Sequence, residues 1–330
     1  MITDSHGRTI NYLRLAVTDK CNLRCTYCMP AVGLNWLPKA ELMTTEEMLR
    51  ISRLLITMGV EKIRITGGEP FVRKDLMPFL GELSKMLGHG LKEITLTTNG
   101  LLTEPYIPEL KKLGIRSVNL SLDTLDRQRF IDITRRDALP QVLNTLEKLL
   151  LAGIAVKINT VVMEDCNTQD ILPLVALTKS MPVSVRFIEE MPFNGGTHDI
   201  SLSWNFSRII EHIREQYPDL AKMQDPIHAT ALNYHIEGHQ GDIGVIAAYT
   251  RSFCGSCNRL RITAKGGLRT CLYGQGVLNL KDLIRAGASD QVIEKQLLSA
   301  VLNKPLDGWE AEKNKTNNII KQPSMATIGG

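Results

Sequence analysis

Hydrophobic residues in the first 190 positions recur with two periods, one typical of strands and one typical of helices. Short runs of β-branched residues predict strands, and apolar residues three or four positions apart predict amphipathic helices. The clearest helix begins after Thr44, where Glu47 completes a capping box, and it ends before Gly59. The predicted strands cover residues 13–17, 60–66, 93–97, 117–122, 156–162 and 183–188.

Helical patterns lie between most of these strands. Beyond the helix that follows Thr44, they cover residues 76–87, 105–113, 138–151 and 169–178. Strand–helix units that repeat about every 25–35 residues imply a parallel sheet with right-handed crossovers. We therefore predict an α/β protein with a partial (β/α)6 TIM-like barrel, whose chemistry should lie at the C-terminal ends of the strands. A doubly wound sheet is the competing topology.

The pattern changes near residue 190, where a loop rich in Pro and Gly begins. A helix is predicted over 204–217, strands over 231–237, 243–249 and 259–263, and two further helices over 278–286 and 291–302. This order predicts a C-terminal antiparallel α+β extension. The chain is thus divided into a barrel (1–190), the extension (191–310), and a polar, mobile tail (311–330) that ends in Gly-Gly.

Composition and charge narrow the class of protein. Of the 330 residues, 43% are hydrophobic and only 5% aromatic, which suits an aliphatic α/β core. The net charge of +4 is too small to indicate a nucleic-acid binder. However, no acidic residue lies between Asp242 and Asp282, whereas that interval holds six basic ones: Arg251, Arg259, Arg261, Lys265, Arg269 and Lys281. An anionic ligand is expected there, with a solvated basic face as the alternative.

Targeting signals are not evident. The first ten residues contain no apolar run, and the longest apolar stretch, 149–156, is shorter than the roughly 20 residues that a membrane span requires. We therefore expect a soluble cytoplasmic protein that does not engage a membrane. Since the cytoplasm keeps thiols reduced, grouped cysteines in such a protein indicate a metal or catalysis rather than disulfides.

Six of the seven cysteines form two groups of three. Cys21, Cys25 and Cys28 follow the first long strand with three and two intervening residues, and Cys254, Cys257 and Cys271 lie in the acid-free segment. Structural zinc sites and ordinary iron–sulfur clusters use four ligands, so three thiolates would leave one position open. Structural zinc is the alternative for either group. Cys166 stands alone and is expected to be a small buried residue.

The first group resembles a known signature. The sequence CNLRCTYC at 21–28 is similar to the cysteine motif of the radical S-adenosylmethionine (SAM) superfamily, and TGGEP at 66–70 resembles its glycine-rich SAM motif. The resemblance implies a [4Fe-4S] cluster on three thiolates, with SAM on the fourth iron. Glycines at that loop would let the backbone approach a ligand closely.

Further motifs extend the resemblance over nearly the whole chain. They are RLAVTD at 14–19, TTNG at 97–100, SLD at 121–123, KIN at 157–159, RFIE at 186–189 with Met191, CNRLR at 257–261, and the terminal Gly329 and Gly330. Together they resemble the GTP 3′,8-cyclase family, which opens molybdopterin biosynthesis. In that family, a radical from SAM takes hydrogen from C3′ of GTP, and ring closure gives (8S)-3′,8-cyclo-7,8-dihydroguanosine 5′-triphosphate.

The resemblance also implies residue roles and partners. Two [4Fe-4S] clusters would be held, one by Cys21, Cys25 and Cys28, the other by Cys254, Cys257 and Cys271. SAM would contact Tyr27, Gly68, Ser121 and Met191, and GTP would contact Arg14, Arg64, Thr97, Lys157, Arg259, Leu260 and Arg261. Gly329 and Gly330 would reach the site and assist catalysis. An electron donor, a downstream pterin-forming synthase and a homodimer are further expectations.

The basic residues support an anion site without the resemblance. Arg259 and Arg261 are two positions apart on a predicted strand, so both should face the same side. Basic side chains inside a barrel are costly unless they meet an anion; the alternative is that some, Arg186 above all, pair with buried carboxylates. Two other functions remain open: a peptide-modifying radical SAM maturase, and a zinc or iron–sulfur sensor that binds nucleic acid through residues 250–270.

Overall fold

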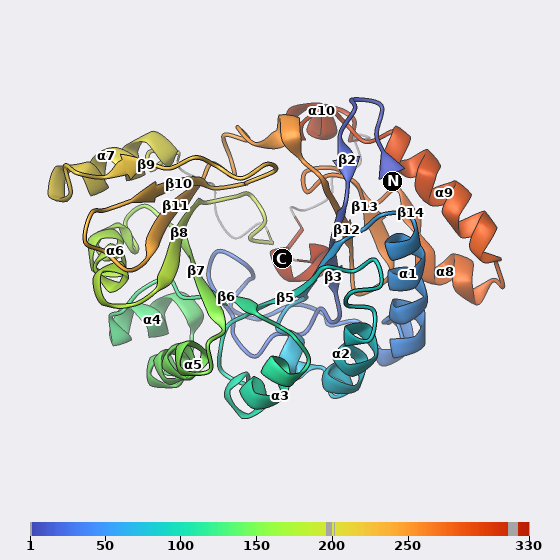
Figure 1. Ribbon diagram of the computed structural model, residues 1–330, viewed down its shortest axis with the longest axis horizontal. Coiled ribbons are helices and arrows are strands. Elements are labelled where there is room, and N and C mark those ends of the chain that lie inside the picture. The colour runs from blue at the N-terminus through green and yellow to red at the C-terminus, as the bar shows by residue number, and fades with distance from the viewer. Residues whose placement is uncertain (1, 196–199, 201, 316–322, 330) are drawn as a thin grey trace.

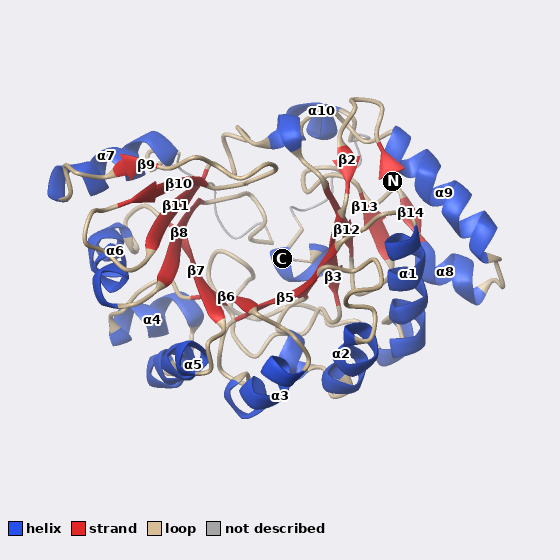
Figure 2. Ribbon diagram, viewed as in Figure 1, coloured by secondary structure: helices blue, strands red, loops and turns tan. Residues whose placement is uncertain are grey.

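The computed structural model describes residues 2–195, 200, 202–315 and 323–329, and their main feature is one strongly curved sheet (Figures 1 and 2). Within this part of the chain, the sheet has twelve strands in the order β14-β13-β12-β3-β4-β5-β6-β7-β8-β11-β10-β9. Its six barrel strands are β3 (Tyr12–Ala16), β4 (Lys62–Thr66), β5 (Glu93–Thr98), β6 (Ser117–Ser121), β7 (Ala155–Val162) and β8 (Val183–Glu189).

The barrel strands confirm the predicted fold class. All five neighbouring pairs from β3 to β8 are parallel and follow the order of the chain. A doubly wound sheet would reverse direction at a switch point, so the consecutive order excludes that alternative. The sheet curves in one direction only and its concave side holds the site described below (Figure 1).

Helices cover the convex side of the sheet (Figure 2). Those of the barrel are α1 (Thr45–Thr57), α2 (Leu76–Ser84), α3 (Ile107–Lys112), α4 (Arg127–Thr134), α5 (Leu139–Leu151) and α6 (Ile171–Ser180). The capping box predicted for the first helix is present, because Thr44 Oγ1 accepts from Glu47 N at 3.2 Å and Thr44 N donates to the Glu47 carboxylate at 2.8 Å. Only α4 was not predicted, since it is short and few of its residues are apolar.

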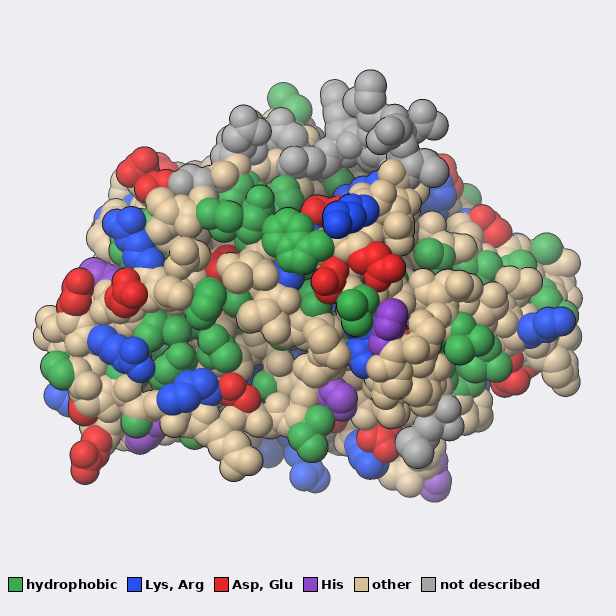
Figure 3. Space-filling view, turned by 90° about the horizontal axis from the view of Figure 1, so that it is seen from above, with side chains coloured by type: hydrophobic (Ala, Val, Ile, Leu, Met, Phe, Trp, Pro, Cys, Tyr) green, Lys and Arg blue, Asp and Glu red, His purple; other side chains and the backbone are tan. Residues whose placement is uncertain are grey.

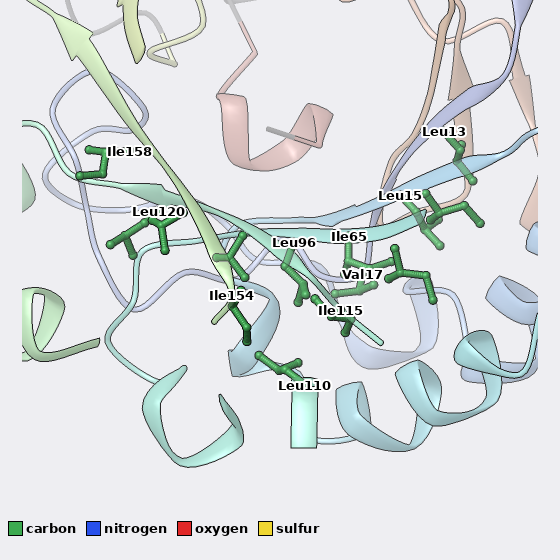
Figure 4. Packing of buried hydrophobic residues seen from close by; sticks show 14 of the residues in the cluster. Leu13, Leu15, Val17, Ile65, Leu96, Leu110, Ile115, Leu120, Ile154 and Ile158 are labelled. Carbon is green, nitrogen blue, oxygen red and sulfur yellow. The ribbon is translucent and has the colours of Figure 1, made fainter. Parts of the chain in front are cut away.

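The hydrophobic core lies between the sheet and these helices. Figure 4 shows Leu15, Ile65, Leu96 and Leu120 of four adjacent strands packing together, with Leu110 of α3 beneath them. Leu15, Ile65, Leu96 and Leu120 are fully buried. Each strand therefore sends its apolar residues outward to the helices, which leaves the alternate residues of the same strands facing inward.

The C-terminal extension adds strands at both edges of the barrel sheet. One edge carries β9 (Ala221–Lys222), β10 (Leu232–His235) and β11 (Asp242–Ile246); the other carries β12 (Arg259–Ile262), β13 (Gly267–Arg269) and β14 (Leu278–Asn279). Antiparallel pairing holds within each set, as predicted, but β11 joins β8 and β12 joins β3 in parallel. The extension thus continues the barrel sheet, and the expectation of a wholly antiparallel appendage is corrected.

The remaining helices lie around the extension. They are α7 (Phe206–Gln216), α8 (Leu280–Arg285), α9 (Asp290–Leu302), α10 (Gly308–Lys313) and α11 (Met325–Ile328). Helix α10 crosses residue 311, where the sequence analysis begins the tail. Within the described residues, none of the helices is both long and apolar enough to span a bilayer. On the face seen in Figure 3, acidic and basic side chains are interspersed with hydrophobic ones.

A short hairpin at the N-terminus, absent from the sequence prediction, pairs β1 (Ile2–Thr3) with β2 (Thr9–Ile10). Buried Arg8 extends from this hairpin toward the extension. Its guanidinium pairs with Asp4 at 2.6 Å and donates to the carbonyl oxygens of Cys254 (3.2 Å) and Pro305 (2.7 Å). The first residues of the chain therefore support the loop that carries the second cysteine group.

Candidate active site

The concave side of the sheet encloses a cavity of about 730 Å³. Residues from every barrel strand line it, together with the loop before β10 and part of the segment around α11. Since inward-facing positions alternate along each strand, the lining follows the period-two pattern of the strands. The cavity thus lies on the side of the sheet that the helices leave uncovered.

The first cysteine group lines this cavity from the loop after β3. Cys21, Cys25 and Cys28 all contribute to the lining, as the sequence predicts. Backbone hydrogen bonds from Arg24 and Thr26 to the end of α4 hold the loop at 3.1 and 2.9 Å. Burial raises the pKa of the Cys21 thiol to about 12, and burial with the charge of Asp123 raises the pKa of the Cys25 thiol as well. Bound iron would provide the positive charge that the thiolate forms require.

Gly67 and Gly68, in the loop after β4, pack closely against the segment that precedes Cys21. Gly68 N donates to Thr18 O at 2.9 Å, and Glu69 N donates to Lys20 O at 2.8 Å. A Cβ added to Gly68 would stand 2.3 Å from Lys20 O and 2.6 Å from Asp19 O. Gly68 is therefore required by the close approach of two backbones of this chain, which also fixes the position of the first cysteine.

Replacing Gly68 with alanine is expected to destabilise the protein by about 1–3 kcal/mol, because the added methyl group must push the backbone of residues 19–20 away. Urea unfolding of the iron-free protein measures this loss. Gly81→Ala is the matched control: Gly81 lies in α2 with nothing within 4 Å of the added Cβ, so alanine should preserve or raise stability. Equal effects of both substitutions would contradict the argument.

Three buried carboxylates near the cavity are bound by backbone and hydroxyl groups. Glu69 accepts from Thr98 Oγ1 and Asn99 N, and Asp123 accepts from Tyr27 Oη at 3.0 Å and from Val161 N at 2.9 Å. The carboxylate of Glu189 accepts from the backbone N of residues 206 and 250. Burial raises the pKa of Glu69 to about 7 and that of Asp123 to about 6. Among the described residues, no Arg or Lys forms an ion pair with any of the three.

The basic residues therefore face the cavity without these carboxylate partners. Arg261 of β12, Arg14 of β3 and Arg64 of β4 are direct neighbours in register across three parallel strands. We call these three residues the arginine row. All three line the cavity, and Arg14 Nε is buried without a hydrogen-bond partner among the described residues. Burial and the neighbouring arginines lower the pKa of Arg14, and also that of Arg261 to about 10.

Two further cations line the opposite side of the cavity. Lys157 lies on β7 and Arg186 on β8, and burial lowers their pKa values to about 8 and about 10. Arg186 Nε is buried and has no hydrogen-bond partner in the described part of the chain. Arg186 was not among the predicted site residues because a buried carboxylate could have paired with it. Its alternation with apolar Val185 and Phe187 along the predicted strand is the sequence signal that places it on the inner face.

The acid-free segment does not act as one basic face. Of its six cations, Arg259 and Arg261 line the cavity. Lys265 pairs with Glu41, Arg251 with Glu312 and Lys281 with Asp282, while Arg269 donates to Gly274 O. The expectation of an anion-binding segment therefore narrows to the two arginines of β12.

The second cysteine group lies beside the cavity. Its neighbours Phe253, Asn258 and Leu272 are among the lining residues. Burial raises the pKa of Cys254, with smaller contributions from the charges of Cys271 and Cys257, so the three thiols interact. Burial also acts on Cys257, but the charges of Arg259 and Lys304 outweigh it and lower its pKa to about 6. The two cysteine groups thus have different electrostatic environments.

The end of the chain enters the cavity, and Figure 1 shows α11 in the middle of the curved sheet. Gly329 O accepts from Arg261 Nη1 at 3.2 Å and from Thr66 Oγ1 at 3.3 Å. Ser324 Oγ lies 3.7 Å from Cys28 Sγ. Residues 323–329 of the predicted tail are therefore packed against both the arginine row and the first cysteine group. Gly330, also predicted to assist, lies outside the described residues.

Most of the side chains predicted to form the site come together in the cavity. Besides the three cysteines of the first group, they are Tyr27, Gly68, Ser121, Met191, Arg14, Arg64, Thr97, Lys157, Arg259 and Arg261. Leu260 differs, because it lies between the two arginines of β12 and its fully buried side chain packs in the hydrophobic core on the other face. Tyr12 and Lys62 also line the cavity and were not predicted, although each stands two positions before an arginine of the row.

The residues present fit a cluster with SAM and an anionic substrate. Three thiols line one cavity, a chain of cations lines the same space, and a buried guanidinium nitrogen lacks a partner among the described residues. In that part of the chain, no three Cys, His, Asp or Glu side chains are grouped closely enough to hold a single metal ion. The fit to an iron–sulfur cluster therefore rests on two observations: the thiols and the cations line the same cavity, and thiolates are the usual ligands of such clusters.

The fold and the first cysteine group together define a radical SAM barrel. The family model described as the radical SAM superfamily matches residues 15–177, and the model Molybdenum Cofactor Synthesis C matches residues 183–308. A crystal structure of Streptococcus suis SuiB bound to S-adenosylmethionine superposes on 94% of this chain and 69% of its own, with a TM-score of 0.65 and 17% identity. That similarity concerns the fold.

The chain belongs to the GTP 3′,8-cyclase family. A GTP 3′,8-cyclase of Peptoclostridium acidaminophilum is 42% identical over 334 residues, which cover 100% of this chain and 98% of that protein. The human molybdenum cofactor biosynthesis protein 1 is 42% identical over 301 residues, covering 91% of this chain and 47% of the human protein. The chain thus spans about half the length of the first curated relatives that it matches.

Proposed function

We propose that this protein converts GTP to (8S)-3′,8-cyclo-7,8-dihydroguanosine 5′-triphosphate as a radical SAM GTP 3′,8-cyclase. The observation that carries the proposal is the position of the arginine row: three arginines in register face the same cavity as the first cysteine group. Like charges at such spacing repel each other, and an anionic substrate between them and the thiols would offset that repulsion.

In this proposal, Cys21, Cys25 and Cys28 hold the first [4Fe-4S] cluster, and Tyr27, Gly68, Ser121 and Met191 surround SAM. When bound, the cluster supplies the electron that splits SAM and so provides the radical that takes hydrogen from C3′ of GTP. The protein's own contribution is to orient the groups and exclude water. Asp123 holds the Tyr27 hydroxyl at 3.0 Å, which fixes this wall of the SAM site.

The triphosphate is assigned to the cations of the cavity. Arginine forks bind phosphate oxygens in pairs, and such charge-assisted hydrogen bonds are stronger than neutral ones. Arg14, Arg64, Arg259 and Arg261 approach from one side of the cavity, and Lys157 and Arg186 approach from the other. Thr97 adds a hydroxyl group that can donate to a phosphate oxygen, and the substrate would lie between the arginine row and the first cysteine group.

A second [4Fe-4S] cluster on Cys254, Cys257 and Cys271 is part of the proposal. Its support is that the three thiols lie close enough for their charges to interact, and that the charges of Arg259 and Lys304 lower the pKa of Cys257 to about 6, which favours its thiolate. A cluster held by these three thiolates would keep one iron without a protein ligand, where the substrate could bind. We also propose an electron donor, a homodimer and a pterin-forming synthase that receives the product, all supported by family membership. A cytoplasmic location is proposed as well, from the sequence of the first ten residues and the lack of a long apolar stretch.

One anaerobic experiment tests the function. The protein is reconstituted with iron and sulfide, supplied with dithionite and SAM, and assayed for 5′-deoxyadenosine with and without GTP. The expected result is GTP-dependent release of 5′-deoxyadenosine and formation of a cyclised nucleotide. Release of 5′-deoxyadenosine with no nucleotide product would favour a peptide-modifying maturase, and zinc in place of iron would favour a nucleic-acid sensor.

The affinity for GTP is expected to fall as pH rises above about 8. Burial, Arg186 and Lys62 bring the pKa of Lys157 to about 8 in the free protein. Phosphate groups favour the charged ammonium, so GTP binding raises this pKa and takes up a proton, whereas below pH 7 the lysine is charged in both states. Calorimetry at pH 7.5, 8.25 and 9.0 measures this dependence.

Lys157→Met provides the comparison for the pH series, because it removes the titrating group. Its affinity should be lower at pH 7.5 and nearly constant up to pH 9. Lys157→Arg keeps a charge over the whole range and should bind GTP with little pH dependence. An equal pH dependence in the wild type and the methionine variant would assign the titration to another group.

A further inference from the structure

Lys304 is a buried lysine beside the second cysteine group. It stands two residues after the end of α9 and is 3% exposed. Its ammonium group donates to the carbonyl oxygens of Arg259 (3.3 Å) and Thr270, and lies 3.7 Å from Cys257 Sγ. Among the described residues, no carboxylate lies within ion-pair distance of this ammonium group.

The missing carboxylate distinguishes Lys304 from the other buried cations of this region. Arg8 pairs with Asp4, Arg251 with Glu312 and Lys281 with Asp282. Burying an ammonium group without a nearby anion is costly. The group able to carry negative charge that the Lys304 ammonium contacts is the sulfur of Cys257. A thiolate at Cys257 would therefore balance the positive charge of Lys304.

The same ammonium group joins the two segments that carry the second cysteine group. Arg259 stands two residues after Cys257, and Thr270 immediately precedes Cys271. By donating to the carbonyl oxygens of both segments, Lys304 holds them at a fixed separation. The first cysteine group has carboxylates rather than a lysine beside it. Asn99 contacts Cys21 Sγ at 3.8 Å and donates its backbone N–H to the Glu69 carboxylate at 2.7 Å, and Tyr27, between Cys25 and Cys28, donates to Asp123 at 3.0 Å.

We propose that Lys304 is a positioning residue that holds the two segments of the second cysteine group and supplies the counter-charge of its iron–sulfur cluster, which makes that cluster easier to reduce than the first. The inference rests on the proposed second cluster. Reduction by dithionite adds one electron to the cluster. A fixed positive charge near the sulfur stabilises the reduced, more negative cluster, whereas nearby carboxylates at the first cluster disfavour it.

The test is a redox titration of the reconstituted protein, followed by electron paramagnetic resonance, with dithionite as reductant. A variant with Cys254, Cys257 and Cys271 replaced by alanine identifies the signal of the first cluster. In the wild type, the second cluster should be reduced at the higher potential. Lys304→Gln keeps hydrogen-bond donors but removes the charge, and should lower the equilibrium constant for reduction of the second cluster about tenfold, equivalent to about 59 mV.

Two controls separate charge from fold. Lys304→Arg keeps the charge and should stay close to the wild type. Lys281→Gln replaces another buried lysine of the extension, one that pairs with Asp282, and should leave both potentials unchanged. If the glutamine variant loses the second cluster while the arginine variant keeps it, the counter-charge role is supported as well, provided that the first cluster persists in both.

Three results would overturn the inference. The first is an unchanged reduction potential of the second cluster in Lys304→Gln. The second is an equal shift of the reduction potentials of both clusters in that variant. The third is loss of the second cluster in Lys304→Arg as well as in Lys304→Gln. A different result would reject the second cluster itself. The wild-type protein would then contain about four iron atoms per chain, and replacing the second cysteine group would leave this iron content unaltered. The iron content therefore distinguishes failure of the proposed function from failure of the role assigned to Lys304.

Discussion

Cys25→Ser is expected to reduce SAM cleavage to the background of the assay. Cys25 is the middle residue of the first cysteine group, on the loop that lines the cavity. A serine oxygen is a poor ligand for an iron–sulfur cluster, which thiolates hold, so the first cluster should be lost together with the open iron that SAM needs. Iron analysis and 5′-deoxyadenosine release under dithionite measure the two effects.

Cys166→Ser is the matched control for this substitution. Cys166 lies outside both cysteine groups, between β7 and α6, and does not line the cavity. It should keep the iron content and the turnover of the wild type. Turnover that survives in Cys25→Ser would mean that the first cysteine group is not the SAM site, and the proposed function would have to be abandoned.

Replacing both Arg259 and Arg261 with alanine is expected to weaken GTP binding by about 100-fold or more. Each arginine can form charge-assisted hydrogen bonds worth roughly 1.5–3 kcal/mol, and a factor of ten corresponds to about 1.4 kcal/mol. Both side chains line the cavity from alternate positions of β12. Calorimetric titration with GTP, alongside iron analysis, measures the change, and the iron content should remain that of the wild type.

Arg53→Ala controls for the loss of a positive charge as such, since Arg53 is exposed on α1, on the convex side of the sheet. Its affinity for GTP should be unchanged. Loss of iron from the double variant would show instead that the two arginines are structural, for example through the hydrogen bond that Arg261 donates to Gly329 O.

The cysteine spacings and the strand periods could be predicted because both are local properties. Cys21, Cys25 and Cys28 lie within eight residues, so a single loop brings them together. The alternation along β12 likewise placed Arg259 and Arg261 on the same face, and it places Leu260 in the core. The resemblance named these two arginines together with Leu260, and the alternation of the strand decided which of the three side chains reach the cavity.

Contacts between distant segments could not be predicted in this way. Arg8, Cys254 and Pro305 meet although about 250 and 50 residues separate them along the chain. Lys304 belongs to no recognisable motif and to no hydrophobic repeat, so the sequence does not indicate a role for it. Its role follows only from the burial of its ammonium group and from the absence of a carboxylate near it in the described structure.

The sequence by itself determined the six strand–helix units, the two groups of three cysteines and the family. Hydrophobic periodicity and motif spacing depend only on the order of residues that are close together in the chain. Only the tertiary structure decided that the extension joins both edges of the barrel sheet, that the arginine row forms, and that residues 323–329 enter the cavity. The physical reason is that register, burial and the pairing of charges depend on which segments pack together, and packing is settled by the whole fold.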